Sequence, residues 1–156
     1  MRSSPGGPSG SPGQPPPARF ADERLRRWLL IRGRGDRPVP AGVQPEEIRA
    51  HSSSKRPSVQ RGDLAILYAA VWQAVFGVAE VVGEPENDPA RDRWAWRFPI
   101  RPLVVVRDLH DAPAVEEAGI FPQSLWRHSH IRLAPAQFDS ARELIEAAAR
   151  LQGSRA

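Results

Sequence analysis

Two histidines near the C-terminal end offer the most evident potential for metal chemistry. His128 and His130 alternate along an expected strand, so both imidazoles would point to the same side. They could serve as two ligands of a metal ion. A zinc site needs at least three protein ligands, however, and no third ligating side chain stands nearby. The chain also has no cysteine, which removes thiolate nucleophiles and every Cys-based zinc site. We therefore expect no metal site.

Familiar catalytic motifs are absent from the sequence. It contains no G-x-S-x-G and no H-E-x-x-H, and the Gly33-Arg34-Gly35 turn is too short to cradle a phosphate. These absences favour a protein that binds a ligand over an enzyme with its own catalytic apparatus.

Segregated charge indicates an anionic partner. The net charge is +4, and the basic residues are 21 Arg and one Lys. Residues 19–61 carry 11 basic and 5 acidic side chains, residues 62–90 carry 5 acidic and no basic ones, and residues 91–107 carry 5 basic and 1 acidic. Basic blocks on a shared face would attract phosphate, and salt would weaken the binding. The alternative is a merely solvated surface.

A change in composition marks the domain boundary. Residues 1–18 contain six Pro, four Gly and four Ser, too few apolar side chains to offset the entropy of an ordered chain. We expect a disordered tail there and one domain over residues 19–156. The sequence has no apolar run long enough to cross a bilayer and no secretory signal, so we expect a cytoplasmic protein without membrane contact.

Strands are the main elements expected to position these side chains. Apolar runs bounded by turn residues predict five of them: residues 27–32, 64–69, 71–82, 94–106 and 130–133. The second and third should form a hairpin. In the fourth, Trp94 and Trp96 would share a face with Phe98 as part of the core. The segment from His51 to Ser58 is polar and interrupted by Pro57, and it is not among the predicted strands.

Helices are expected to flank the sheet. Short helical segments are predicted at residues 45–49, 113–118 and 121–126. From Pro135 the apolar spacing describes an amphipathic helix, with an apolar stripe of Phe138, Ala141, Leu144, Ile145, Ala148 and Leu151. About five strands with these helices predict an α+β fold in which a mixed, curled sheet closes toward a barrel.

The order of these elements and several local motifs resemble the EVE family of the PUA-like superfamily, which also includes PUA, ASCH and YTH domains. The similarity covers roughly residues 27 to 147. The similar stretches are Arg27-Trp28-Leu29-Leu30, Gly62-Asp63-Leu64-Ala65-Ile66-Leu67-Tyr68, Gly77-Val78-Ala79-Glu80-Val81, and Arg127-His128-Ser129-His130-Ile131 followed by Pro135-Ala136-Gln137-Phe138. The family's tryptophan-glycine and arginine-asparagine segment has no clear match in His51 to Gln60.

The resemblance implies a PUA-like pseudo-barrel with a pocket for a modified or flipped-out base in DNA or RNA, and no cofactor. Extruding a base from the stack costs a few kcal/mol. Stacking on an aromatic ring returns about 1–3 kcal/mol per base, so the site needs aromatic faces.

Six residues are candidates for this base-binding pocket: Trp72, Trp126, Ser129, Arg127, Tyr68 and Trp28. Trp72 or Trp126 would stack on the base. Ser129 matches the family's arginine-x-serine strand, and its hydroxyl can both donate to and accept from a base edge. Arg127 would hold a phosphate or pair with an acid such as Asp63. The alternative for Trp28 is a place in the core, and for Ser129 a local cap of the backbone.

Four basic side chains of the early segment would track the nucleic-acid backbone: Arg49, Lys55, Arg56 and Arg61. Solvated loop positions are the alternative for them.

Two other functions stay open. Some ASCH relatives are similar to small amidohydrolases that use a lysine, a hydroxyl residue and a glutamate; here Lys55, Ser58 and Glu80 could supply these groups for an acylated nucleoside. A protein-interaction module would use the Pro-rich tail and the acidic loop of residues 83–92.

Overall fold

The structure of the chain is a computed structural model that describes residues 20, 22, 24–125 and 127–155. The predicted tail of residues 1–18 and the side chain of Trp126 lie outside the described residues. The strands are β1 (Arg27–Arg32), β2 (Ala50–Ser53), β3 (Leu64–Ala69), β4 (Ala74–Val81), β5 (Glu86–Asn87), β6 (Trp96–Val105) and β7 (His130–Arg132). Short 3₁₀ helices cover Pro45–Glu47, Leu109–Asp111, Val115–Ala118 and Pro122–Leu125, and the chain ends in helix α2 (Pro135–Arg155).

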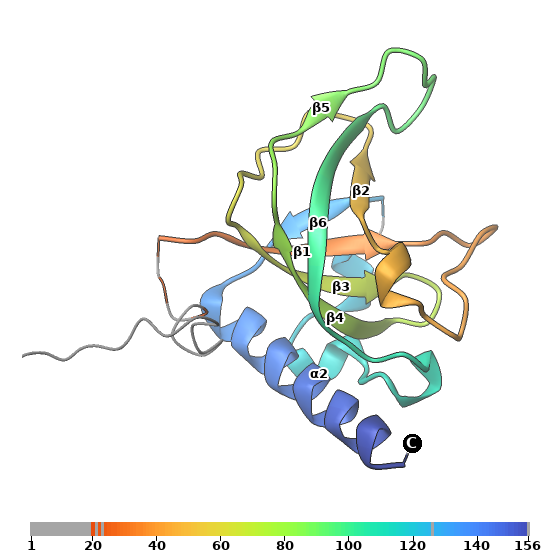
Figure 1. Cartoon of the computed structure of the whole chain (residues 1–156). Coiled ribbons are helices and arrows are strands. Elements are labelled where there is room, and N and C mark those ends of the chain that lie inside the picture. Colours follow the sequence, from red (N-terminus) through yellow and green to blue (C-terminus); the bar gives the residue numbers. More distant parts are fainter. Residues whose placement is uncertain (1–19, 21, 23, 126, 156) are drawn as a thin grey trace, which may run out of the picture.

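The strands form one mixed sheet in the order β2-β6-β4-β3-β1-β7, with β5 paired to β6. Strands β1 and β3 are parallel, and the other pairs are antiparallel. Figure 1 shows the sheet curling around the upper part of the molecule while α2 crosses beneath it. The predicted α+β architecture with a mixed, curled sheet is therefore confirmed.

The central strands β3 and β4 are apolar except for Glu80 near the end of β4, because both of their faces are covered. All six residues of β3 are buried, as are seven of the eight residues of β4. Helix α2 packs on one face of β4, β6, β3 and β1, with Phe138, Ala141 and Ile145 fully buried against the sheet. Leu151 was expected on the same stripe, but its side chain is 62% exposed because the helix runs past the edge of the core.

Two irregularities and a glycine allow the sheet to curl. The pairing register shifts between Leu67 and Tyr68 in the β3–β4 ladder, and between Val78 and Ala79 in the β4–β6 ladder. Such bulges increase the local twist of a strand. At Gly77 a Cβ atom would lie 2.8 Å from Leu67 Cδ1 and 3.3 Å from the Val104 carbonyl oxygen. Only glycine leaves room for this close approach.

The glycine-aspartate turn before β3 anchors β1 to the sheet. Gly62 has φ of +94°, a conformation that favours glycine, and this places the Asp63 side chain in the interior. Asp63 Oδ2 accepts hydrogen bonds from Trp28 Nε1 and from the Gln60 backbone N–H, each at 2.9 Å. Arg26 Nη2 lies 3.4 Å from the same oxygen. The turn therefore holds a buried carboxylate with three partners.

Side chains close the barrel where the backbone ladder stops. Strands β2 and β7 stand at opposite ends of the sheet order, yet His51 Nε2 of β2 lies 2.8 Å from the carbonyl oxygen of Ser129, the residue before β7. Ser129 Oγ donates a hydrogen bond to Ser53 Oγ at 3.2 Å. We call this junction of His51, Ser53 and Ser129 the seam.

Two sequence expectations fail around the seam. No strand was predicted in the polar segment from His51 to Ser58, but Ala50–Ser53 forms β2. His51 and Ser53 point inward, and β6 supplies a ladder for this short polar strand. Trp94 was expected to share a strand face with Phe98. The strand begins only at Trp96, and Trp94 has φ of +55°, which turns it out of the alternating pattern.

Candidate functional site

A cavity of about 810 Å³ opens beside the seam. This volume lies within the range of small-molecule pockets, roughly 300–1,000 Å³. Its walls come from the end of β1, the 33–44 loop, β2, the loop that carries Trp94, and the segment from Pro122 to Ser129. Segments far apart in the chain meet here because the curled sheet brings together β2 and β7, the strands at the two ends of the sheet order.

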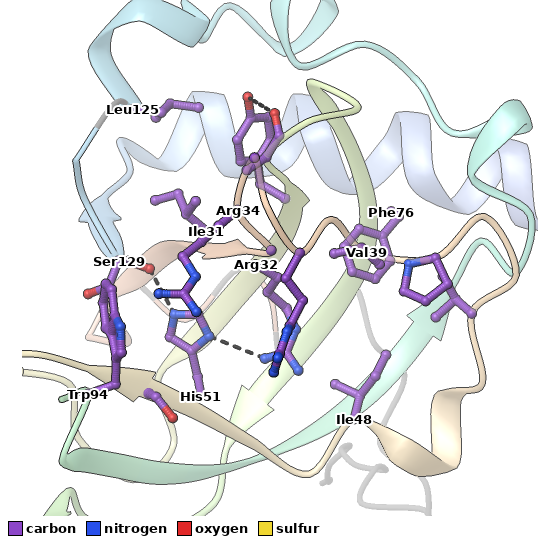
Figure 2. Close-up of a pocket in the computed structure, with 18 of the residues that line it drawn as sticks. Ile31, Arg32, Arg34, Val39, Ile48, His51, Phe76, Trp94, Leu125 and Ser129 are labelled. Carbon is purple, nitrogen blue, oxygen red and sulfur yellow. Dashed lines mark hydrogen bonds between the residues drawn. The ribbon is translucent and has the colours of Figure 1, made fainter. Parts of the chain in front are cut away.

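His51 lies at the centre of the cavity wall and has a fixed tautomer (Figure 2). Arg32 Nη1 lies 3.2 Å from His51 Nδ1, and since a guanidinium can only donate, Nδ1 must accept. The ring proton is then on Nε2, which donates to the Ser129 carbonyl oxygen at 2.8 Å. Burial and the Arg32 charge lower the pKa of His51 to about 3. The ring is neutral and both its nitrogens are engaged.

Arg32 brings a cation into this enclosed wall. Besides His51, its Nη1 donates to the Ala50 carbonyl oxygen at 3.0 Å. Burial lowers the pKa of Arg32, and no neighbouring carboxylate offsets this effect. A positive charge thus faces the cavity without a counter-ion among the described residues.

Aromatic and apolar groups line the rest of the interior. Tyr68 and Phe76 contribute buried rings, and burial raises the pKa of the Tyr68 phenol. Trp94 is half-buried and lies on the side of Ser129, whereas Val39 and Ile48 stand across His51 from it (Figure 2). A planar, partly apolar ligand would find stacking and van der Waals contacts in such a space.

Arginines surround the mouth of the cavity. Four exposed ones are among its lining residues: Arg34, Arg37, Arg91 and Arg127. A two-residue turn with two backbone hydrogen bonds of 3.0 Å pairs Arg34 with Arg37, so their side chains leave the same face of the turn. The Arg34 guanidinium also lies 5.8 Å from the centre of the Trp94 ring. Glu47 is the one acidic side chain among the described lining residues, so the mouth is strongly cationic.

The structure brings together three of the six predicted base-binding residues. Tyr68, Arg127 and Ser129 line the cavity. The hydroxyl of Ser129 also contacts His130 Nδ1 at 2.7 Å, so it takes part in the seam as well as in the cavity wall. Trp126 lies outside the described residues.

Trp28 and Trp72 lie away from the cavity. Trp28 is 5% exposed, and its indole N–H is committed to Asp63, in agreement with its alternative place in the core. Trp72 is half-buried, donates from Nε1 to the Val39 carbonyl oxygen at 2.8 Å and contacts the edge of the His110 ring. The Trp28 indole therefore has a partner outside the cavity lining, whereas the Trp72 indole holds Val39, which lines the cavity, from behind.

The four predicted phosphate-binding residues are exposed but do not line the cavity. Arg49 Nε donates to the Glu46 carbonyl oxygen at 2.9 Å, and the Arg56 guanidinium lies 5.5 Å from the Trp96 ring centre. Lys55 and Arg61 stand on the connection between β2 and β3. The described arginines that line the cavity come instead from the end of β1, from the 33–44 loop and from positions 91 and 127.

Of the groups considered for catalysis or metal binding, only His128 lines the cavity. Lys55 and Ser58 are exposed, and Glu80 Oε1 accepts a hydrogen bond from Arg101 at 2.5 Å; none of these three lines the cavity. His128 precedes β7 and lines the cavity, whereas His130 is on the strand. The described residues contain no group of three His, Asp or Glu side chains that could hold a metal ion.

Sequence reasoning missed Arg32, Arg34, His51 and Trp94 as lining residues. A glycine on each side of Arg34 was a usable signal, because a tight turn after β1 exposes its side chain. His51 and Ser129 are 78 residues apart, and no local pattern relates them. Trp94 was missed because its alternation with Trp96 predicted a core position on a strand, whereas the strand begins only at Trp96.

Mild acid should destabilise the protein through His51. The pKa of this buried ring is lowered from its ordinary value of 6.5 to about 3. Between these pH values the imidazole is protonated in the unfolded chain but neutral in the folded chain. The stability from the neutral ring is present above pH 6.5 and is lost as the pH falls from there toward 3. We expect the free energy of unfolding to drop by about 2 kcal/mol between pH 7 and pH 5 in urea denaturation.

The control is His51→Gln, which keeps a donor and an acceptor but does not titrate. Its stability should depend less on pH, although His130, whose pKa is also lowered by burial, retains a smaller effect in the same direction. An unchanged pH dependence in His51→Gln would assign the acid sensitivity to other groups.

Comparison with solved structures identifies the fold of the chain, whereas comparison of sequences finds no relative. No protein-family model and no curated protein sequence matches the chain. Among solved structures, protein Atu2648 from Agrobacterium tumefaciens is 13% identical, with a TM-score of 0.52 over 80% of this chain and 93% of that one. A protein from Pseudomonas putida is 12% identical, with a TM-score of 0.51 over 76% and 99% of the two chains.

A structure of human THYN1 in complex with DNA that contains 5-methylcytosine is also similar. It is 12% identical, with a TM-score of 0.51 over 78% of this chain and 98% of that one. At these identities the likeness concerns the fold. The chain has the α+β, PUA-like pseudo-barrel fold that its sequence predicted.

Proposed function

We propose that this protein is a non-enzymatic module that binds DNA at a modified base, and that the extruded base enters the cavity beside the seam. The observation that carries the proposal is the composition of the cavity: an aromatic and apolar interior behind a mouth of four arginines. Such a site would receive a neutral planar base while the arginines hold the flanking phosphates. The THYN1 structure with 5-methylcytosine DNA and the resemblance of the sequence to the EVE family support the same function.

The state of His51 supports binding over catalysis. A general base must be able to take a proton near neutral pH. The Nδ1 atom of His51 already accepts a hydrogen bond from Arg32, and its low pKa makes protonation unfavourable. In this proposal the ring holds β2 to the end of the barrel and fixes the orientation of Arg32.

The test is a fluorescence-anisotropy titration with labelled DNA duplexes that differ only in one cytosine or 5-methylcytosine. We expect tighter binding of the methylated duplex, by about 4-fold if the methyl group is fully buried. Trp94→Ala should weaken binding about 5- to 150-fold through the loss of one stacking surface. Trp96→Ala is the matched control, because Trp96 is also half-buried, does not line the cavity and contacts Arg56 outside it.

Equal affinity of the two duplexes would exclude methylcytosine as the modification. Loss of binding in Trp96→Ala but not in Trp94→Ala would move the base away from this cavity. RNA of the same sequence, titrated in parallel, decides which polymer is preferred. Absence of binding to every oligonucleotide at low salt would overturn the proposal.

A further inference from the structure

One edge of the Arg32 guanidinium is available for a ligand. The side chain leaves the end of β1 and lines the cavity. Its Nη1 is used twice, toward the Ala50 carbonyl oxygen and His51 Nδ1. Neither Nε nor Nη2 has a hydrogen-bond partner among the described residues. The fully buried nitrogens without a partner are on other residues, so Nε and Nη2 of Arg32 are both accessible.

The geometry of guanidinium makes this edge a rigid pair of donors. The group is planar, and Nε–H and one Nη2–H point in the same direction, side by side. Its rotation is restricted because Nη1 is held by two acceptors, and the His51 acceptor is itself fixed by the bond from Nε2 to Ser129 (Figure 2). The partner that fits is a pair of adjacent acceptor atoms in one plane.

We propose that Arg32 restricts the bound base to those that present two adjacent acceptors, which admits cytosine and guanine derivatives and excludes those of thymine and adenine. This inference rests on the proposed function. Guanine offers O6 and N7, and cytosine offers O2 and N3. Thymine carries a proton on N3 between its two carbonyl groups, and adenine places its amino group next to both N1 and N7. Each of these bases would therefore place a donor against the donor pair of Arg32, which we call the fork.

A substituent on C5 of cytosine is compatible with this contact. C5 lies on the opposite side of the ring from O2 and N3, so a methyl group there does not touch Arg32. Thymine has the same C5 methyl group and nearly the same ring shape. The comparison of 5-methylcytosine with thymine therefore isolates the hydrogen-bonding edge.

The test uses single-stranded oligothymidylate with one variable central base, because single strands remove the cost of unpairing. The central base is 5-methylcytosine, guanine, adenine or thymine, and binding is followed by anisotropy at moderate salt. For the wild-type protein we expect 5-methylcytosine and guanine to bind at least about 10-fold more tightly than thymine and adenine. Replacing guanine by 7-deazaguanine removes N7 and should return the affinity to the thymine level.

Arg32→Lys keeps the charge but removes the fork. Thermal unfolding checks that the variant is folded, and its preference for 5-methylcytosine over thymine should fall to about 2-fold or less. Arg49→Lys is the control, because Arg49 is exposed and does not line the cavity. If Arg32→Lys does not fold, the 7-deazaguanine comparison on the wild-type protein decides.

The outcomes separate this inference from the function on which it rests. Equal binding of all four central bases by the wild-type protein, with DNA still bound, would overturn the role of Arg32 alone. An undiminished preference in folded Arg32→Lys would do the same. Failure to bind any oligonucleotide would overturn the proposed function and this inference with it.

Discussion

DNA affinity should fall roughly 10- to 100-fold at 0.1 M salt when Arg37 and Arg91 are both replaced by glutamine. Both side chains are exposed at the mouth of the cavity and come from different loops, so together they would contact phosphates on two sides of an extruded base. Each lost phosphate contact should lower the slope of log affinity against log salt by about 0.9, giving a decrease of about 2 for the pair. Titrations at several salt concentrations measure this slope.

The double variant Arg49→Gln/Arg61→Gln is the matched control. It removes the same charge from two exposed arginines that do not line the cavity. These two positions belong to the phosphate-binding set predicted from the sequence, so the pair of variants compares that set with the arginines at the mouth. A larger loss in Arg49→Gln/Arg61→Gln would place the DNA backbone on the β2–β3 connection instead.

Asp63→Ala should lower the free energy of unfolding by about 3–5 kcal/mol. The substitution leaves the buried indole N–H of Trp28 and the backbone N–H of Gln60 without an acceptor, and it removes the partner of Arg26. Each unsatisfied buried donor costs about 1–3 kcal/mol. The expected loss is a large share of the roughly 5–15 kcal/mol that holds a small domain together. Urea denaturation at pH 7 is the measurement.

Two further variants test the cause of this loss. Asp63→Asn keeps one acceptor oxygen in place and should cost less than Asp63→Ala. Asp36→Ala removes a carboxylate that is exposed and 3.9 Å from Arg34, so it should change the stability by no more than about 0.5 kcal/mol. If Asp63→Ala were as stable as Asp36→Ala, the turn would not anchor β1 through its carboxylate.

The Asp63 turn and the Arg32 side chain contribute differently to stability. The Asp63 turn is a fully partnered polar cluster and stabilises the barrel, whereas Arg32 keeps one edge without a protein partner beside the cavity. A partly buried charge without a counter-ion is costly in the free protein. Under the inference drawn for Arg32, a base with two adjacent acceptors would offset that cost upon binding.

Local signals in the sequence determined the fold class and most of the elements. Buried strands such as β3 are apolar throughout, Gly62 requires a positive φ, and α2 shows a helical apolar period, so each could be recognised from neighbouring residues alone. The strand β2 escaped recognition because its inward residues, His51 and Ser53, are polar and are satisfied only by partners distant in the chain.

The candidate site, in contrast, was decided by the tertiary structure. Sequence placed Tyr68, Ser129 and Arg127 among the pocket residues, and these do line the cavity. It could not supply Arg32 and His51, whose positions depend on the closure of the barrel between β2 and the segment before β7. That closure brings together residues separated by 78 positions through side-chain hydrogen bonds, which leave no periodic trace in the sequence.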